Sequence, residues 1–306
     1  VGWFASTFFA KSRTSGGVHF FSGKDVLHAP GVHFNFLLVV VAAIAICALV
    51  GILIGLPTLR LRGDYIAIVT LAFGEIIRVV VTNGDSIHLF GYKLTNGKQG
   101  INPLDLPTLP GYGELPDTSI NLRPWYWLAL VMVLIVLYCN LRLRDSRLGR
   151  AWVALREDEV AAASMGVPLV KTKLLAYAMG ASFGGMSGAF LGFDLTQVNS
   201  DQFEFSFSIL ILAMVILGGL GSIWGVVLGA TLLSFLSTYF INDLAATWPR
   251  KLGLGLDTPE LSFGIFGFLL VAMMVLRPEG LLPERRRKLE LTEDTTSGES
   301  VYEASA

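Results

Sequence analysis

An uncharged apolar run occupies residues 34–56, and it is long enough to cross the hydrocarbon core of a bilayer as a helix. The composition agrees, because only 15% of the residues are charged, against about 25% in a typical soluble domain. These charges are gathered into a few short clusters with long apolar runs between them. The sequence therefore predicts an integral membrane protein.

Further apolar runs predict that the chain crosses the bilayer several more times. They lie at 64–81, 125–139, 174–193, 205–220, 222–241 and 261–276. We therefore expect an all-α, polytopic transmembrane helix bundle at 1–276, with a charged loop at 142–173. The polar tail at 277–306 is expected to be disordered. Within 205–241 only the Gly218-Gly219 region indicates a turn.

The chain begins at Val1 on a short apolar stretch, 1–10. This stretch is too short to cross a bilayer and lacks the basic flank of a signal peptide. We interpret it as the end of a helix whose beginning is missing. A non-standard start codon written as Val is the alternative.

The distribution of Lys and Arg among the loops predicts the orientation. Seven of these residues lie in the loop 142–173, five lie in the tail, and Arg60 and Arg62 lie between the first two runs. Alternating spans place all three clusters on one face, which is expected to be cytoplasmic. The opposite face keeps Arg123, Arg250 and Lys251, which are scattered.

Glycines recur at helical spacing in two of the runs. Such stripes let neighbouring helices approach closely in lipid. Two interpretations stay open: static tight packing, and smooth faces along which helices slide or rock during transport. Both predict helices inside the bundle. The stripes are Gly180, Gly184, Gly188 and Gly192 in one run, and Gly221, Gly225 and Gly229 in another.

The charged loop contains an amphipathic segment. Ala161, Ala162 and Ala163 form a patch of small residues, and Gly166 followed by Pro168 predicts the end of a helix. By itself this pattern suits two structures equally well: a solvated helix joining two spans, and a helix that docks on a partner.

Three stretches carry information beyond hydropathy. They read LPTLRLRGDYIAIVTLAFGEIIR at 56–78, DSRLGRAWVALREDEVAAASMG at 145–166 and SILILAMVILGGLGSIWG at 208–225, while RPEGLL at 277–282 closes the last span. Together they closely resemble the permeases of branched-chain amino-acid ABC importers, the LivH/LivM permease family, and its LivM type in particular. The resemblance covers 34–283. The early Gly-rich spans expected from the family are absent before Val1, so no substrate contacts are assigned there.

The resemblance gives the loop a role. It is similar to the EAA loop of ABC permeases, represented here by Glu159, Ala161, Ala162 and Gly166. The family implies that this helix docks into a cleft of an ATPase subunit, with alanines as a close-fitting surface and a glycine at the turn. The residues expected to take part are Arg156, Glu157, Asp158, Glu159, Ala161, Ala162 and Gly166.

Glu75 and Arg78 are charges inside a predicted span, where ionised side chains are costly unless paired. Their i,i+3 spacing allows them to pair on one helix face, which should point into the bundle. One interpretation is a structural ion pair, with Arg78 reaching towards the outer interface. The other is a substrate path in which Glu75 binds the ammonium and Arg78 the carboxylate of an amino acid.

Other chemistry is not indicated. His19, His28, His33 and His88 are expected in solvent-exposed outer loops, without the neighbours that a metal site requires. Cys47 and Cys139 lie in apolar runs and are interpreted as small hydrophobic residues. No phosphate-binding Gly-x-x-x-x-Gly-Lys-Ser/Thr loop and no recognisable catalytic motif is present, so we expect no cofactor, metal or catalytic site. The sequence contains no long basic stripe of the kind that would predict nucleic-acid binding.

The resemblance implies a transport subunit of the bacterial plasma (inner) membrane. Its expected partners are a second, LivH-like permease subunit, two cytoplasmic ATPases, an outer substrate-binding protein and membrane lipid. ATP would close the ATPase pair, and the loop would transmit that closure to the spans. The expected substrates are leucine, isoleucine and valine, whose apolar side chains suit a lining of Ile, Leu, Val, Phe and Gly.

Two classes of alternative stay open: another ABC importer, and a protein that is not an importer of this kind. A permease for urea or short amides shares the overall pattern of the ABC group. An ion-coupled secondary transporter should show inverted repeats and broken helices around a charged midplane site, which the sequence does not suggest. A membrane enzyme should show several acidic or His residues facing one bilayer surface, and no such group is apparent.

Overall fold

A computed structural model describes most of the chain. The described residues are 1–6, 18–20 (backbone only), 32–59, 61, 64–89, 92–109, 113–116, 121–219, 221–236, 271 and 280–282. The chain divides into two compact units, Val1–Glu204 and Phe205–Ala306, and each is described by itself.

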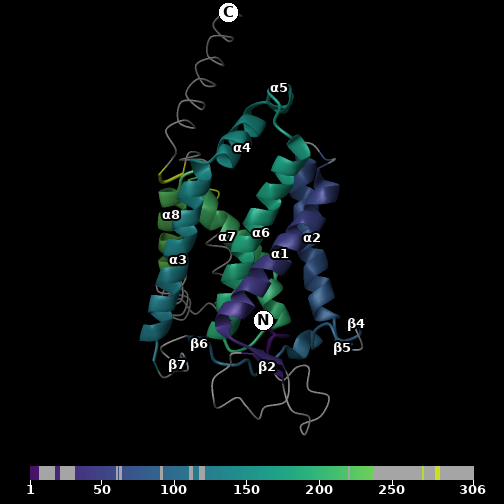
Figure 1. Ribbon diagram of the computed structural model, residues 1–306, viewed down its shortest axis with the longest axis vertical. Helices are drawn as coiled ribbons and strands as arrows, with labels where there is room; N and C mark the ends of the chain where they lie inside the picture. Colours follow the sequence, from purple (N-terminus) through teal and green to yellow (C-terminus); the bar gives the residue numbers. More distant parts are fainter. Residues whose placement is uncertain are drawn as a thin grey trace, which may run out of the picture. The chain divides into compact units, whose positions relative to one another are not determined.

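The first unit consists of helices with short strands and turns at one end (Figure 1). Its helices are α1 (Phe36–Thr58), α2 (Asp64–Thr82), α3 (Arg123–Arg144), α4 (Arg147–Glu157), α5 (Glu159–Ser164) and α6 (Leu169–Asp194), with 3-10 turns η3 (Gly97–Gln99) and η4 (Ser200–Phe203). Its strands are β1 (Ala5–Ser6), β2 (Val18–Phe20), β3 (Val32–Phe34), β4 (His88–Leu89), β5 (Tyr92–Lys93), β6 (Thr108–Leu109) and β7 (Gly113–Glu114).

Helices α1 and α6 form the centre of this unit and run antiparallel. At one end, the rings of Phe36 in α1 and Phe193 in α6 meet edge to face, with centroids 5.2 Å apart. At the other end, a Cβ on Gly55 of α1 would lie 3.1 Å from side-chain atoms of Leu174 and Tyr177 in α6. The absence of a side chain at Gly55 therefore allows the close approach.

Strands, turns and loops come together at one end of the first unit. The interpretation of the first residues as the end of a helix is wrong for 1–6, which form turns and strand β1. Strand β3 lies between β1 and β2, antiparallel to β1 and parallel to β2. The Asp105 N–H donates to the Ala5 carbonyl at 2.9 Å, and the Ile101 N–H donates to the Val198 carbonyl at 2.9 Å. Thr95 Oγ1 donates to the Val81 carbonyl near the end of α2 at 2.6 Å. Hydrogen bonds therefore join segments that are far apart in the sequence at this end of the unit.

Helices α4 and α5 lie at the opposite end of α6 from these strands (Figure 1). Because α1 and α6 are antiparallel, α1 ends at the same end as α4 and α5. The predicted alternation of spans requires this arrangement.

The second unit contains α7 (Phe205–Gly218) and α8 (Ile223–Phe235), which pack through glycines. A Cβ on Gly229 would lie 2.7 Å from the Cα of Gly218. The Leu281 and Leu282 N–H groups donate to the carbonyls of Leu217 and Gly218, at 2.9 and 3.1 Å, and so pair carbonyls at the end of α7. The beginning of the tail thus lies beside the α7–α8 turn.

The two predicted glycine stripes differ in how closely they pack against other helices. Gly225 and Gly229 approach α7 closely. Gly221, predicted in the same helical stripe, lies instead in the turn before α8, with φ +93°. Gly192 is buried, but a Cβ on Gly180, Gly184 or Gly188 would meet no described atom within 4 Å. Close packing on α1 instead uses Gly185, where a Cβ would lie 2.8 Å from the Ala43 carbonyl oxygen. The packing of the three open glycines stays a prediction.

Within the described residues, α1, α3 and α6 are long and apolar enough to cross a membrane. The predicted span at 64–81 forms the 19-residue α2, which carries Asp64, Glu75 and Arg78. Helices α7 and α8 are apolar but shorter, with 14 and 13 residues. The end of the predicted span 222–241 lies outside the described residues. So do the predicted span 261–276, except Val271, and the tail, except 280–282.

Candidate functional site

The charged loop forms two helices rather than one, and each has an identifiable start. Helix α4 begins after Ser146, whose Oγ accepts from the Gly149 N–H at 3.1 Å and donates to the Leu143 carbonyl at 2.6 Å. A serine at this position is a typical N-cap, because its side chain satisfies a free N–H of the first turn.

Asp158 separates α4 from α5. Its backbone is extended, with φ −153° and ψ 115°, so the α4 helix cannot continue through it. Its carboxylate accepts from the N–H groups of Val160 and Ala161 at 2.7 and 3.1 Å. The side chain of Asp158 therefore caps α5. The contact of Asp158 with an ATPase stays a prediction.

Gly166 ends α5, as the sequence predicts. Its φ of +84° is favourable only for glycine. The Gly166 N–H donates to the Ala163 carbonyl and the Val167 N–H donates to the Ala162 carbonyl, both at 3.0 Å. This pair of bonds is the Schellman arrangement, which closes a helix and turns the chain sharply.

The exposed surface of α5 and of Met165, the residue that follows it, is largely apolar. Val160 and Met165 are 76% and 86% exposed, and Ala161 and Ala163 are exposed as well. Ala162, which was expected in the same docking patch, is buried instead. One side of this short helix faces the protein, so only the other side is free to meet a partner.

Two side chains attach α4 and α5 to the first turn of α6. The Lys173 ammonium lies 2.5 Å from the Glu159 carboxylate, and Trp152 Nε1 donates to the Thr172 carbonyl at 2.8 Å. Sequence reasoning assigned Glu159 to an ATPase contact, used Lys173 only for the orientation, and gave Trp152 no role. The contacts join residues 14 and 20 positions apart, and no local pattern marks them.

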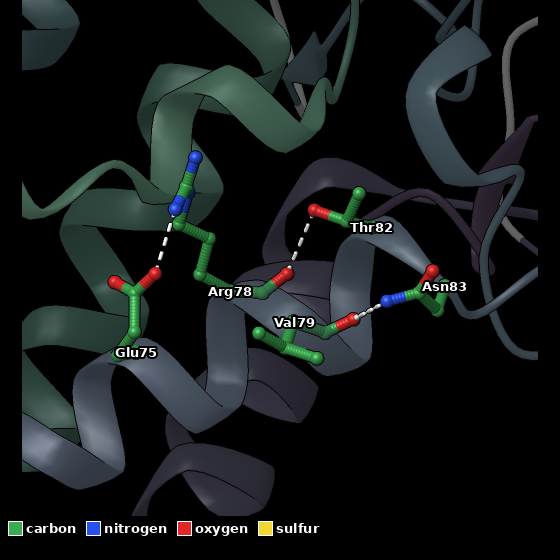
Figure 2. A network of polar contacts seen from close by, with 5 residues as sticks. All are labelled: Glu75, Arg78, Val79, Thr82 and Asn83. Atoms are coloured by element: carbon green, nitrogen blue, oxygen red, sulfur yellow. Dashed lines mark hydrogen bonds and ion pairs between the residues drawn. The ribbon is translucent and has the colours of Figure 1, made fainter.

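Glu75 and Arg78 form the ion pair that their spacing predicts. Arg78 Nη1 lies 2.6 Å from Glu75 Oε1 (Figure 2), and the side chains are 42% and 45% exposed for Arg78 and Glu75 respectively. The negative charges of Asp201 and Glu204, in and beside η4, also attract the guanidinium. Arg78 therefore lies in a negatively charged setting near the end of α2 that contacts η4.

The prediction of exposed histidines is wrong for His33. Its side chain is buried, and Nδ1 lies 2.5 Å from Asp105 Oδ2. The pair joins β3 to the loop before β6, and burial follows because β3 is the middle strand of its sheet. His88 is exposed, whereas the side chains of His19 and His28 lie outside the described part of the chain.

Comparison with known proteins gives the family. The family model described as "Branched-chain amino acid transport system / permease component" matches residues 3–274. The chain belongs to this family. No solved structure matches it significantly.

Curated members of this family resemble the chain along most of its length. The high-affinity branched-chain amino acid transport system permease proteins LivM of Salmonella typhimurium and of Escherichia coli are each 37% identical to it, over 84% and 83% of the chain. The match covers 59% of each LivM, so the chain spans about three fifths of the length of these relatives. The corresponding LivH protein of Escherichia coli is 28% identical over 68% of the chain and 64% of its own length.

Proposed function

We propose that this chain is the membrane-spanning permease subunit of an ATP-driven importer of branched-chain amino acids, without an ATPase site of its own. The observation that carries the proposal is α5, a short capped helix of six residues with an exposed apolar surface, at the end of the membrane-length helix α6. The naming of its LivM and LivH relatives supports the substrate class.

The proposed assembly contains a second permease subunit of the LivH kind, two ATPases and an outer substrate-binding protein. The similarity of this chain to LivH supports a pair of related permease subunits. The α5 end of the first unit is assigned to the cytoplasm of a bacterial plasma membrane, because the Lys- and Arg-rich loop 142–173 belongs there by the positive-inside rule.

In this proposal the residues of this chain bind the ATPase and transmit its movement, and they catalyse no reaction. The exposed side of α5 with Val160, together with Met165 in the turn after it, docks in a cleft of the ATPase, where apolar contact excludes water. Closure of the ATPase pair displaces α5. Helix α6 continues from α5 through the tight turn at Gly166, so the displacement reaches the membrane-spanning part.

Uptake of labelled leucine and labelled urea tests the proposal. Membrane vesicles would carry the full-length chain with its neighbouring permease, ATPases and binding protein, beside a Met165→Glu variant. Ile87→Glu is the matched control, because this exposed apolar side chain lies at the opposite end of the first unit. We expect leucine uptake that requires ATP, falls at least tenfold in Met165→Glu and persists in Ile87→Glu, since a buried unpaired charge in a docking surface costs about two kcal/mol or more.

Other results would change the conclusion in defined ways. Urea uptake without leucine uptake would contradict the substrate and keep the ATP-driven mechanism. Leucine uptake that follows an ion gradient and ignores ATP would overturn the proposal.

A further inference from the structure

Helices α4 and α5 are attached to α6 at two neighbouring residues. Thr172 accepts a hydrogen bond from Trp152 of α4, and Lys173 pairs with Glu159 at the beginning of α5. Thr172 is buried, so the indole bond holds α4 against the covered side of α6. Together with the turn at 165–168, the two contacts make three points of attachment.

Attachment at three points restricts the movement of α5 relative to α6 more than attachment at one point does. Helix α5 is also joined to α4 through Asp158. If Asp158 and the turn at Gly166 were its only links, α5 would be free to swivel about them, and a push on α5 would be lost as rotation. An ion pair at the beginning of α5 and a hydrogen bond from α4 prevent that swivel. A displacement of α5 must then move the first turn of α6.

Helix α6 passes such a movement on to α1. A Cβ on Gly51 of α1 would lie 2.9 Å from the Tyr177 carbonyl oxygen, and one on Gly185 of α6 would lie 2.8 Å from the Ala43 carbonyl oxygen. Backbones this close leave no space for one helix to move into the other, so α1 and α6 are expected to move together.

We propose that Glu159, Lys173 and Trp152 form a clasp that transmits displacement of α5 to the α6–α1 pair, and that these are positioning residues for coupling ATP hydrolysis to transport. The inference rests on the proposed function, and it names the residues through which the coupling passes. The Lys173 and Glu159 side chains are 29% and 54% exposed. Half-exposed ion pairs add little to folding stability, so loss of this pair should affect coupling more than abundance.

The test measures ATP hydrolysed per leucine transported, with the complete transporter in vesicles. The variants are Lys173→Met, which keeps the aliphatic length and removes the charge, Glu159→Gln, and the two combined. Lys171→Met is the matched control, because Lys171 is an exposed lysine two residues away in the same helical turn. Trp152→Phe keeps the ring and removes the Nε1 donor.

We expect each ion-pair variant to raise the ATP-to-leucine ratio about two- to fivefold, the range that an exposed ion pair can supply. The double variant should be no worse than either single one, because both remove the same interaction. Lys171→Met should leave the ratio unchanged, and Trp152→Phe should raise it. The amount of assembled transporter should stay the same in the ion-pair variants.

An unchanged ratio in Lys173→Met and Glu159→Gln would overturn the clasp, and so would an equal rise in Lys171→Met. If Trp152→Phe reduces the amount of assembled protein, the two ion-pair variants decide the question alone. The wild type is measured first. Absence of ATP-dependent uptake there would overturn the proposed function itself, and that outcome is distinct from failure of the clasp.

Discussion

Glu75 and Arg78 carry opposite charges one turn apart on α2, and each has the other as its partner. Their i,i+3 spacing was enough to predict the pair from the sequence. Both side chains remain nearly half exposed among the described residues. Because ionised groups in a span avoid lipid, we expect this face of α2 to meet protein or water in the assembled transporter.

Removing the charges separately and together distinguishes an ion pair from a substrate site. Glu75→Gln or Arg78→Gln alone should lower the amount of protein in the membrane, because each leaves an unpaired charge in a predicted span. The double variant should recover most of that amount and keep leucine uptake, with neutral side chains able to hydrogen-bond. Quantitative membrane immunoblots and the KM for leucine check this. A double variant that is abundant but has lost leucine binding would instead favour the substrate site.

At the scale of elements, the local sequence predicted where a helix ends better than it predicted which residues contact another helix. The end of α5 depends on Gly166 and the residues beside it, so the sequence indicated it directly. The sequence did not predict the break at Asp158, which ends α4 and caps α5. Helix-forming residues precede and follow it, so the pattern resembles one continuous helix. Gly185, rather than the regular stripe beside it, makes the contact with α1.

Adjacent glycines of α6 provide a matched pair of substitutions. Gly185→Ala should destabilise the protein by about 1–3 kcal/mol, because the new methyl group meets the Ala43 carbonyl oxygen and Cys47. Gly184→Ala should be neutral or slightly stabilising, because no described atom lies within 4 Å and alanine favours a helix by about 1 kcal/mol.

The thermal midpoints of the purified transporter measure this difference. A lower midpoint for Gly185→Ala only is the expected result. An equal fall for Gly184→Ala would contradict the expectation that this position is open, and would indicate that the glycine stripe packs against another helix.

At the scale of the whole chain, apolar runs and charge clusters predicted an α-helical membrane protein, and the structure and the family agree. The sequence alone did not predict the pairs that join distant segments. His33 and Asp105 are 72 residues apart, and Trp152 and Thr172 are 20 apart. Such pairs depend on how helices pack, and neither periodicity nor local motifs contain that information.

The membrane face on which α5 lies tests most directly whether the chain couples to cytoplasmic ATPases. With Cys47 and Cys139 replaced by Ala, single cysteines are introduced by Lys171→Cys at the beginning of α6, beside α5, and by Asp85→Cys in the turn after α2. Both positions are exposed, and they lie at opposite ends of the first unit. Intact cells are then treated with a membrane-impermeant maleimide. We expect labelling of Asp85→Cys in intact cells, and labelling of Lys171→Cys only after the membrane is opened. Labelling of Lys171→Cys in intact cells would place α5 outside, where no ATPase can reach it, and would contradict the proposed function.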